Sequence, residues 1–360
     1  MLYAIAFAST LIISFLMTGL ARRLSLKYKI VSKPRKRDIH KKPIPRLGGV
    51  AILISFMIVA LTIFLSLRGH QTGQGLWFGF DKHFVGIVFA GLFIGLTMLF
   101  DDLYGLRAWQ KLLCQIFTVV VVISAGIGIE TLPNPFGRDL NLNSLYIPIL
   151  TYHDITYHFS LWSDLLTLVW MVGMMNVINF VDGVDGLAGG ISTIAAFTIF
   201  ILALSMGQTG LALISIILAG STIGFLFWNF PPAKIFMGDA GSMFLGFMLG
   251  VMPLISGGKL ATAFLVLGFP IVDGLIVAGS RLYQGKNPLT TPDKTHLHHR
   301  FIKAGFSQRQ AIIVIYIIAI AFAWVALRSS TFSKFIAAGI LVVLLVGLIL
   351  YLRYRARKFA

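Results

Sequence analysis

The side chains best suited to chemistry gather in a few short stretches, and the richest of these runs from Asn176 to Gly190. Two amides and two carboxylates stand there among glycines, at the boundary between two apolar runs: Asn176, Asn179, Asp182 and Asp185. Burying such polar groups at a membrane edge costs free energy unless they bind a ligand or a partner. Glycines let a ligand approach the backbone closely. The stretch therefore predicts a ligand site, although ordinary turns and helix N-caps also use Asn and Asp beside glycine.

Other carboxylates stand in comparable places. Asp101 and Asp102 are adjacent at the end of an apolar run, where two carboxylates repel each other unless a cation lies near them. Asp239 opens an apolar run after a Pro-Pro break and has no evident basic partner of its own. Capping of a following helix is the plain alternative at both places. Asp273 lies inside an apolar run, and we expect it to face the protein interior and to hold a neighbour by hydrogen bonds.

Basic side chains accompany these carboxylates. Arg46 ends a basic loop that contains prolines, and we expect it to bind substrate, with an interfacial anchor at lipid headgroups as the alternative. Three imidazoles and a guanidinium fall within five residues, where they can bind phosphate oxygens or a metal: His296, His298, His299 and Arg300. Zinc is disfavoured because no cysteine lies nearby and the His-Glu-x-x-His spacing is absent.

Composition indicates that these residues belong to a membrane protein. The chain is 57% hydrophobic and 12% charged, with a mean hydropathy of +0.87, which is far more apolar than a soluble domain requires. We predict an all-α polytopic protein whose residues 1–360 form a single integral membrane domain with about eleven transmembrane helices. The expected spans are 2–20, 47–67, 84–100, 112–129, 163–181, 187–206, 211–230, 242–256, 260–280, 311–327 and 335–352. The first run lacks a charged leader and a small-residue cleavage site, so we expect it to be a retained span.

The distribution of Lys and Arg predicts the orientation. With the N-terminus outside and the C-terminus in the cytoplasm, 24 of the 30 basic residues fall in cytoplasmic segments. The six outside are Arg68, Lys82, Arg138, Lys259, Arg328 and Lys334. The net charge of +17 then favours anionic membrane lipids, whereas a nucleic-acid partner is disfavoured because no binding module accompanies the basic stretch 33–42. The long outer connection 130–162 is expected to carry a small β-hairpin over 141–157.

In this topology the carboxylates share the cytoplasmic face. Six of the 13 acidic residues belong to the stretches described above or to the histidine-containing loop, and all six are expected at the cytoplasmic edge: Asp101, Asp102, Asp182, Asp185, Asp239 and Asp293. Oxygen ligands of this kind suit Mg²⁺, which commonly binds one or two carboxylates together with substrate phosphates. The pattern predicts Mg²⁺-assisted chemistry on a phosphorylated cytosolic donor, with an acceptor that resides in the membrane. A transporter of a phosphorylated solute is the competing class, but its site would lie near the bilayer midplane.

Four motifs acquire more meaning together than separately. They are Asp101-Asp102, Asn176-x-x-Asn179-x-x-Asp182-Gly-x-Asp185-Gly-Leu, Phe236-Met-Gly-Asp239-x-Gly-Ser242 and His296-x-His298-His299-Arg300. Over about 40–309 the chain resembles the polyprenyl-phosphate N-acetylhexosamine-1-phosphate transferases, and its histidine motif looks like that of the undecaprenyl-phosphate N-acetylglucosamine-1-phosphate transferases. The branch that transfers phospho-N-acetylmuramoyl-pentapeptide typically has three consecutive His followed by an acidic residue. Leu297 and Arg300 depart from that pattern, so this substrate ranks lower.

The resemblance implies a reaction and its participants. An N-acetylhexosamine-1-phosphate, with GlcNAc-1-phosphate ranked first, would pass from a UDP-sugar to undecaprenyl phosphate, and UMP would be released. The reaction would require Mg²⁺, with Mn²⁺ as a substitute, and would begin a lipid-linked envelope glycan at the inner (plasma) membrane of the cell, where the protein would be multi-pass. A homodimer is an open expectation.

The resemblance also assigns roles by matching positions. Asp239 and Asn179 are the expected metal ligands. The expected catalytic residues are Asp101, Asp102, Asp182 and Asp185. Of these, Asp101 or Asp102 would orient or deprotonate the lipid phosphate, and the other two would face the nucleotide or metal-bound water. Asn176 would bind substrate, while Lys111 and the run His296–Arg300 would contact the diphosphate.

Overall fold

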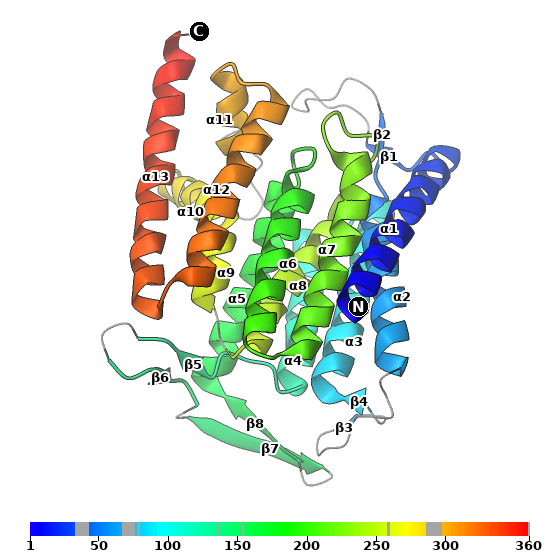
Figure 1. Cartoon of the computed structure of the whole chain (residues 1–360), viewed down its shortest axis with the longest axis vertical. Coiled ribbons are helices and arrows are strands. Elements are labelled where there is room, and N and C mark those ends of the chain that lie inside the picture. The colour runs from blue at the N-terminus through cyan, green and yellow to red at the C-terminus, as the bar shows by residue number, and fades with distance from the viewer. Residues whose placement is uncertain are drawn as a thin grey trace.

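The fold is known from a computed structural model that describes residues 1–32, 43–66, 76–77, 80–134, 137–143, 145–152, 155–257, 260–285 and 297–358. Within these ranges the chain forms thirteen helices, α1 to α13, and eight short strands, β1 to β8. The long helices stand side by side as a bundle, and strands β5 to β8 lie at the end of the bundle opposite to the C-terminus (Figure 1).

The helices occupy the positions that the apolar runs predict. The first six are α1 (Leu2–Lys27), α2 (Gly48–Ser66), α3 (Lys82–Tyr104), α4 (Ala108–Ser124), α5 (Leu161–Val181) and α6 (Leu187–Ser205). The others are α7 (Thr209–Asn229), α8 (Gly238–Ile255), α9 (Leu260–Val266), α10 (Gly268–Tyr283), α11 (Leu297–Lys303), α12 (Gln308–Arg328) and α13 (Thr331–Lys358). Each predicted span therefore has a helix, except that 260–280 is divided between α9 and α10.

Four antiparallel two-stranded ribbons join the helices, so the all-α expectation holds for the bundle but not for its connections. The pairs are β1 (Val31–Ser32) with β2 (Ile44–Pro45), β3 (Leu76–Trp77) with β4 (Phe80–Asp81), β5 (Thr131–Leu132) with β6 (Leu140–Asn141), and β7 (Tyr146–Tyr152) with β8 (Ile155–Ser160). The last ribbon confirms the hairpin expected in the outer connection, a few residues beyond its predicted position.

The described part of the chain offers nine or ten candidate membrane spans, against the eleven expected. Among the described residues, nine helices are long and apolar enough to cross a membrane, and α9 with α10 forms a tenth candidate that is bent by 77°. The apolar helix α4 has 17 residues, a length of about 26 Å against a hydrocarbon core of about 30 Å. The chain is therefore a polytopic membrane protein, while eleven spans and their orientation stay predictions.

Helices α7 and α8 form the centre of the bundle. In their most apolar windows, 89% of α8 and 78% of α7 are buried, against 28% of both α1 and α13. A helix enclosed by protein is apolar on all sides rather than along one stripe. Gly246 lets α8 lie against α5, because a Cβ there would come within 2.6 Å of the Met175 Cα. The buried length of α8 thus fixes the position of its first turn, which carries Asp239.

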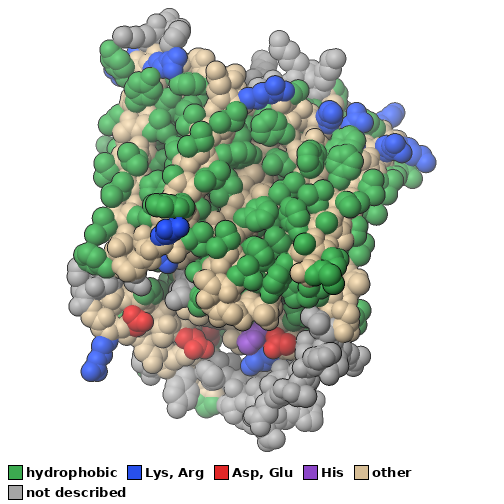
Figure 2. All heavy atoms as spheres, in the orientation of Figure 1, with side chains coloured by type: hydrophobic (Ala, Val, Ile, Leu, Met, Phe, Trp, Pro, Cys, Tyr) green, Lys and Arg blue, Asp and Glu red, His purple; other side chains and the backbone are tan. Residues whose placement is uncertain are grey.

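The surface has an apolar belt between two polar ends. Figure 2 shows hydrophobic side chains across the middle of the bundle, with Lys and Arg gathered mainly at the end that carries the C-terminus. The pair β1–β2 and helix α11 lie at this same end (Figure 1). These segments belong to the connections predicted to be cytoplasmic, so the fold brings them to one side.

Cysteine labelling tests the orientation. In a Cys114→Ser background, we expect Gln284→Cys and Arg357→Cys to react with a membrane-impermeant maleimide only when the cytoplasmic side is accessible, because the charge distribution favours that side. The matched position is Thr209→Cys, the exposed first residue of α7, which should react in intact cells. Reaction of Arg357→Cys in intact cells would show that a span had been counted wrongly.

Candidate active site

The site begins where the start of α2 pairs through backbone hydrogen bonds with the segment just before α8. Phe236 donates its N–H to the Pro45 carbonyl at 2.8 Å. The N–H groups of Gly48 and Gly49 donate to the carbonyls of Phe236 and Met237 at 2.9 and 2.7 Å. The loop before α2 is therefore fixed against the segment that leads into α8.

This pairing requires glycine on both sides. A Cβ on Gly49 would lie 2.2 Å from the Gly241 nitrogen, and a Cβ on Gly241 would lie 2.5 Å from the Gly49 Cα. No side chain fits at such separations, so the two helix starts are in direct backbone contact. As a result Arg46, just before α2, lies beside Asp239 in the first turn of α8.

Three carboxylates form the centre of the site. Asp101 and Asp102 come from the end of α3, and Asp239 comes from the start of α8. One oxygen of each lies within 4.8 Å of the others. Negative charges this close repel strongly at a membrane edge, where water screens them poorly. The cluster can persist only because donors and cations surround it.

Asp102 caps α8 from another helix. Its Oδ1 and Oδ2 atoms accept the N–H groups of Asp239 and Ala240, both at 3.0 Å, and its side chain is 1% exposed. The unpaired N–H groups and the dipole of a helix start favour a carboxylate there. The alternative that Asp239 caps its own helix is wrong, because the N-cap residue is Met237 and Asp239 lies inside the first turn.

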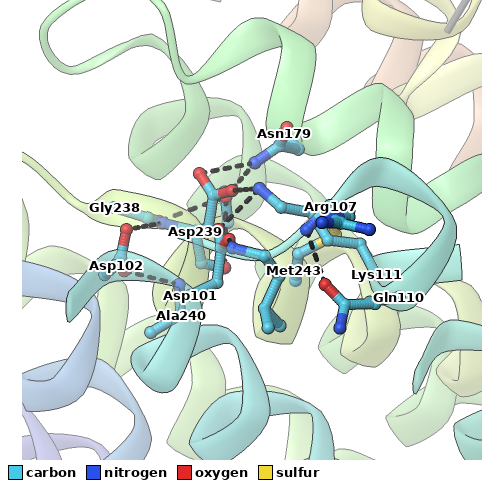
Figure 3. Close-up of polar contacts among 12 residues, drawn as sticks. Asp101, Asp102, Arg107, Gln110, Lys111, Asn179, Gly238, Asp239, Ala240 and Met243 are labelled. Atoms are coloured by element: carbon cyan, nitrogen blue, oxygen red, sulfur yellow. Dashed lines mark hydrogen bonds and ion pairs between the residues drawn. The ribbon is translucent and has the colours of Figure 1, made fainter. Parts of the chain in front are cut away.

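Two cations bridge the three carboxylates. Lys111 Nζ lies 2.5 Å from Asp101 Oδ2 and 2.7 Å from Asp239 Oδ2. Figure 3 draws these three side chains and marks their contacts with dashed lines. Arg46 Nη2 lies 3.1 Å from Asp102 Oδ1 and 3.5 Å from Asp239 Oδ1. The expectation that Asp239 has no basic partner is therefore wrong. Both partners come from distant segments of the chain, which is why the local sequence did not reveal them. Three carboxylates and two cations leave one formal negative charge.

The two asparagines of α5 lie at different distances from this centre. Asn179 donates from Nδ2 to Asp239 Oδ1 at 3.3 Å and to Ser242 Oγ at 2.8 Å. Asn176 donates from Nδ2 to Gln115 Oε1 at 3.0 Å and accepts from Gln115 Nε2 at 3.4 Å. Asn179 therefore belongs to the centre, whereas Asn176 is held one turn away by a buried glutamine.

Asp182 and Asp185 lie in the turn between α5 and α6. Burial raises the pKa of Asp182 well above its usual range, and the negative charges of Asp239 and Asp102 raise it further. Asp185 Oδ2 accepts the Ala233 N–H at 3.0 Å, which ties this turn to the loop before α8. Asp182 and Asp185 thus lie together in a turn that is bound to the loop leading to Asp239.

The histidine motif is described only in part. His296 and the side chains of His298 and His299 lie outside the described residues, and Arg300 lies on α11. Asp273 Oδ1 accepts the Leu297 N–H at 2.9 Å, and Asp273 is 6% exposed. The prediction that this carboxylate faces inward and holds a neighbour is confirmed, and the neighbour is the first residue of α11.

The structure also adds residues that the motifs did not suggest. Gln115 lies one turn after Lys111 on α4, and a glutamine inside an apolar run is a signal that sequence inspection can use. Asn229, Arg309 and Tyr316 bind the backbone of the two loops that carry the carboxylates. Their contacts are to backbone atoms of distant segments, so no local pattern reveals them.

The fold and the site define a polytopic membrane protein with a carboxylate centre at one end of its bundle. Residues 84–257 match glycosyl transferase family 4. The chain is 32% identical over 351 residues to a Bacillus subtilis (strain 168) protein named "Probable undecaprenyl-phosphate N-acetylglucosaminyl 1-phosphate transferase", covering 95% of this chain and 89% of that one.

Two further relatives have similar names. The chain is 34% identical over 331 residues to the decaprenyl-phosphate N-acetylglucosaminephosphotransferase of Mycolicibacterium smegmatis, covering 85% of this chain and 77% of the other. It is 26% identical over 374 residues to the undecaprenyl-phosphate alpha-N-acetylglucosaminyl 1-phosphate transferase of Salmonella typhi, covering 95% and 89%. The chain belongs to glycosyl transferase family 4 and, with these relatives, to the polyprenyl-phosphate N-acetylhexosamine-1-phosphate transferases that its motifs resemble.

The contact between Gly49 and Gly241 yields a prediction. Gly49→Ala should separate the starts of α2 and α8, displace Arg46 from the carboxylates, and lower activity about tenfold or more, since a misplacement of about 1 Å can cost about 10²-fold. The unfolding temperature in detergent should also fall because overpacking strains the helix contact. Gly347→Ala on α13 is the control, because a Cβ there would meet nothing within 4 Å. Equal behaviour of the two variants would contradict the role given to this contact.

Proposed function

We propose that the protein transfers GlcNAc-1-phosphate from a UDP-sugar to undecaprenyl phosphate, with release of UMP, in a Mg²⁺-dependent reaction at the plasma membrane. The names of the relatives support a polyprenyl phosphate as acceptor and GlcNAc-1-phosphate as the transferred group. The product would carry the first sugar of a lipid-linked envelope glycan.

The observation that carries this proposal is the position of the carboxylate centre at one end of a membrane bundle. A UDP-sugar approaches from water, whereas a polyprenyl phosphate holds its phosphate at the membrane surface and its chain in the bilayer. Both reactants are anionic, so their approach requires positive charge that is already in place. Lys111 and Arg46 supply part of it within 3.5 Å of Asp239, and a bound divalent cation would supply the excess over the three carboxylates.

The residues present fit Mg²⁺, which prefers oxygen ligands. Asp101, Asp102 and Asp239 bring carboxylate oxygens within 4.8 Å of one another. By the family resemblance Asp239 and Asn179 would hold the ion. Asp239 would then exchange its ion pairs with Lys111 and Arg46 for the metal, whereas both oxygens of Asp102 stay with the N–H groups of α8. When bound, the ion would neutralise charge on the phosphoryl group in transfer.

The transfer forms a bond from a lipid-phosphate oxygen to the sugar-bearing phosphorus and breaks the bond from that phosphorus to the oxygen that leaves with UMP. A phosphate monoester has a second pKa of about 6, so the attacking oxygen is largely ionised at neutral pH. Asp101 accepts the Leu106 N–H at 2.6 Å, and Asp102 accepts two N–H groups of α8. Both are held by backbone, which favours direct attack by the lipid phosphate and leaves them to orient Lys111 and Arg46.

Replacement of Asp239 tests the centre. Asp239→Asn should abolish transfer, on the order of 10²-fold or more, because a metal ligand acts directly in the transition state. The assay follows label from a radioactive UDP-GlcNAc into butanol-soluble lipid, with the unfolding temperature as a check on folding. Asp139→Asn, an exposed carboxylate in the connection between β5 and β6, is the matched control and should keep full activity. Near-normal transfer by Asp239→Asn with unchanged Mg²⁺ dependence would overturn the assignment.

Substitution of Arg300 tests whether this residue binds the donor or the acceptor. Arg300→Lys keeps the charge but loses the two-pronged guanidinium, so the KM for the UDP-sugar should rise more than the KM for the lipid. Arg300→Glu should nearly silence the enzyme, because a carboxylate repels the diphosphate, and it should not create activity with a muramoyl-pentapeptide donor. A change confined to the lipid KM in Arg300→Lys would assign the residue to the acceptor instead.

A further inference from the structure

The turn that carries Asp182 and Asp185 ends at Gly186, whose φ of +77° places it in the left-handed region just before α6. Its N–H donates to Asn229 Oδ1 at 2.8 Å. Its carbonyl accepts the N–H of Gly190 at 2.9 Å, which is the first hydrogen bond of α6. The backbone of Gly186 is therefore already satisfied by its own helix and by α7.

Tyr316 adds a second donor to the same carbonyl. Its hydroxyl, on α12, donates to the Gly186 oxygen at 2.5 Å. The residue that makes room for it is Gly190, because a Cβ there would lie 1.8 Å from the hydroxyl oxygen. Since the helix does not need this bond to satisfy the carbonyl, its evident effect is to fix where the turn lies relative to α12.

Helix α12 holds the facing loop as well. Arg309 Nε donates to the Pro231 carbonyl at 2.8 Å, in the loop that leads from α7 to Asp239. The two loops are joined to each other because Asp185 accepts the Ala233 N–H. Through Tyr316 and Arg309, one helix thus sets the spacing between the turn 182–186 and the segment that enters α8.

We propose that Tyr316 is a positioning residue for the transfer reaction, which holds the turn 182–186 so that Asp182 and Asp185 meet the UDP-sugar. This inference rests on the proposed function. Small displacements of groups that bind a reactant are costly, because catalysis depends on near-attack geometry. Loss of the hydroxyl should therefore weaken use of the donor without unfolding the protein.

The test is Tyr316→Phe, which keeps the ring and removes only the hydroxyl. The kcat/KM for UDP-GlcNAc should fall about tenfold, as expected for the loss of one buried hydrogen bond that places a binding group. The KM for polyprenyl phosphate should not change, and the unfolding temperature should fall no further than in a control that loses a comparable buried hydrogen bond. Ser14→Ala is the matched control, because it removes another buried hydroxyl-to-carbonyl bond, from Ser14 on α1 to the Ser221 carbonyl on α7 at 2.6 Å. Its kinetics should equal those of the unaltered enzyme.

Calorimetric binding of UDP-GlcNAc, measured without polyprenyl phosphate, separates the inference from the proposed function. Weaker donor binding in Tyr316→Phe, with unchanged binding in Ser14→Ala, supports the positioning role. Unchanged donor kinetics and binding in Tyr316→Phe, an equal loss in both variants, or a loss that accompanies a clearly larger fall in unfolding temperature than Ser14→Ala shows would overturn it. If the unaltered protein transferred no sugar phosphate, the proposed function would fail, and failure to bind UDP-GlcNAc would overturn the inference too.

Discussion

The mutual repulsion of Asp101, Asp102 and Asp239 is the constraint on which the architecture of the site depends. Their oxygens lie within 4.8 Å of one another at the edge of a membrane bundle, where such an arrangement is unfavourable without compensation. Compensation comes from Lys111, Arg46 and the N–H groups of α8, and each reaches the cluster from a different segment. Helices α2, α3, α4 and α8 must therefore meet at one end.

Backbone contact makes that meeting possible. Gly49 and Gly241 remove the side chains that would keep α2 from α8, and Gly238, at a φ of +76°, leaves room for Asp102. A Cβ on Gly238 would lie 2.6 Å from Asp102 Oδ2. The glycines around Asp239 thus leave room for two parts of the protein itself, the Asp102 carboxylate and the start of α2. Because most of α8 is buried, its packing in the core holds this first turn in place.

The sequence predicted the groups of the site better than their partners. Asp101, Asp102, Asn179 and Asp239 stood out because polar residues at the ends of apolar runs are conspicuous. The pairing of Lys111 and Arg46 with Asp239 could not be found in this way, because 128 and 193 residues separate them. Such contacts depend on how helices pack, and local patterns do not specify packing.

The fold shows the same division between what local pattern reveals and what it does not. Apolar runs located a helix at each expected span because hydrophobic length is a strong local signal. The span 260–280 was expected to be continuous, yet it divides into α9 and α10 with a bend of 77°. Gly268 and Pro270 stand at the break, and both residue types interrupt helices. The short ribbons were mostly missed because two-residue strands leave no periodicity to detect.

The single excess negative charge at the centre has a consequence for the order and strength of binding. Formal charge counting makes the centre more receptive to a cation than to a diphosphate, and a divalent cation would change its sign from −1 to +1. The same centre would then attract the anionic donor that it had disfavoured. Cation and donor would thus bind cooperatively, and thermodynamic reciprocity requires that each strengthen the other by the same factor. Departure of one phosphate-bearing product would in turn lower the affinity of the centre for the cation.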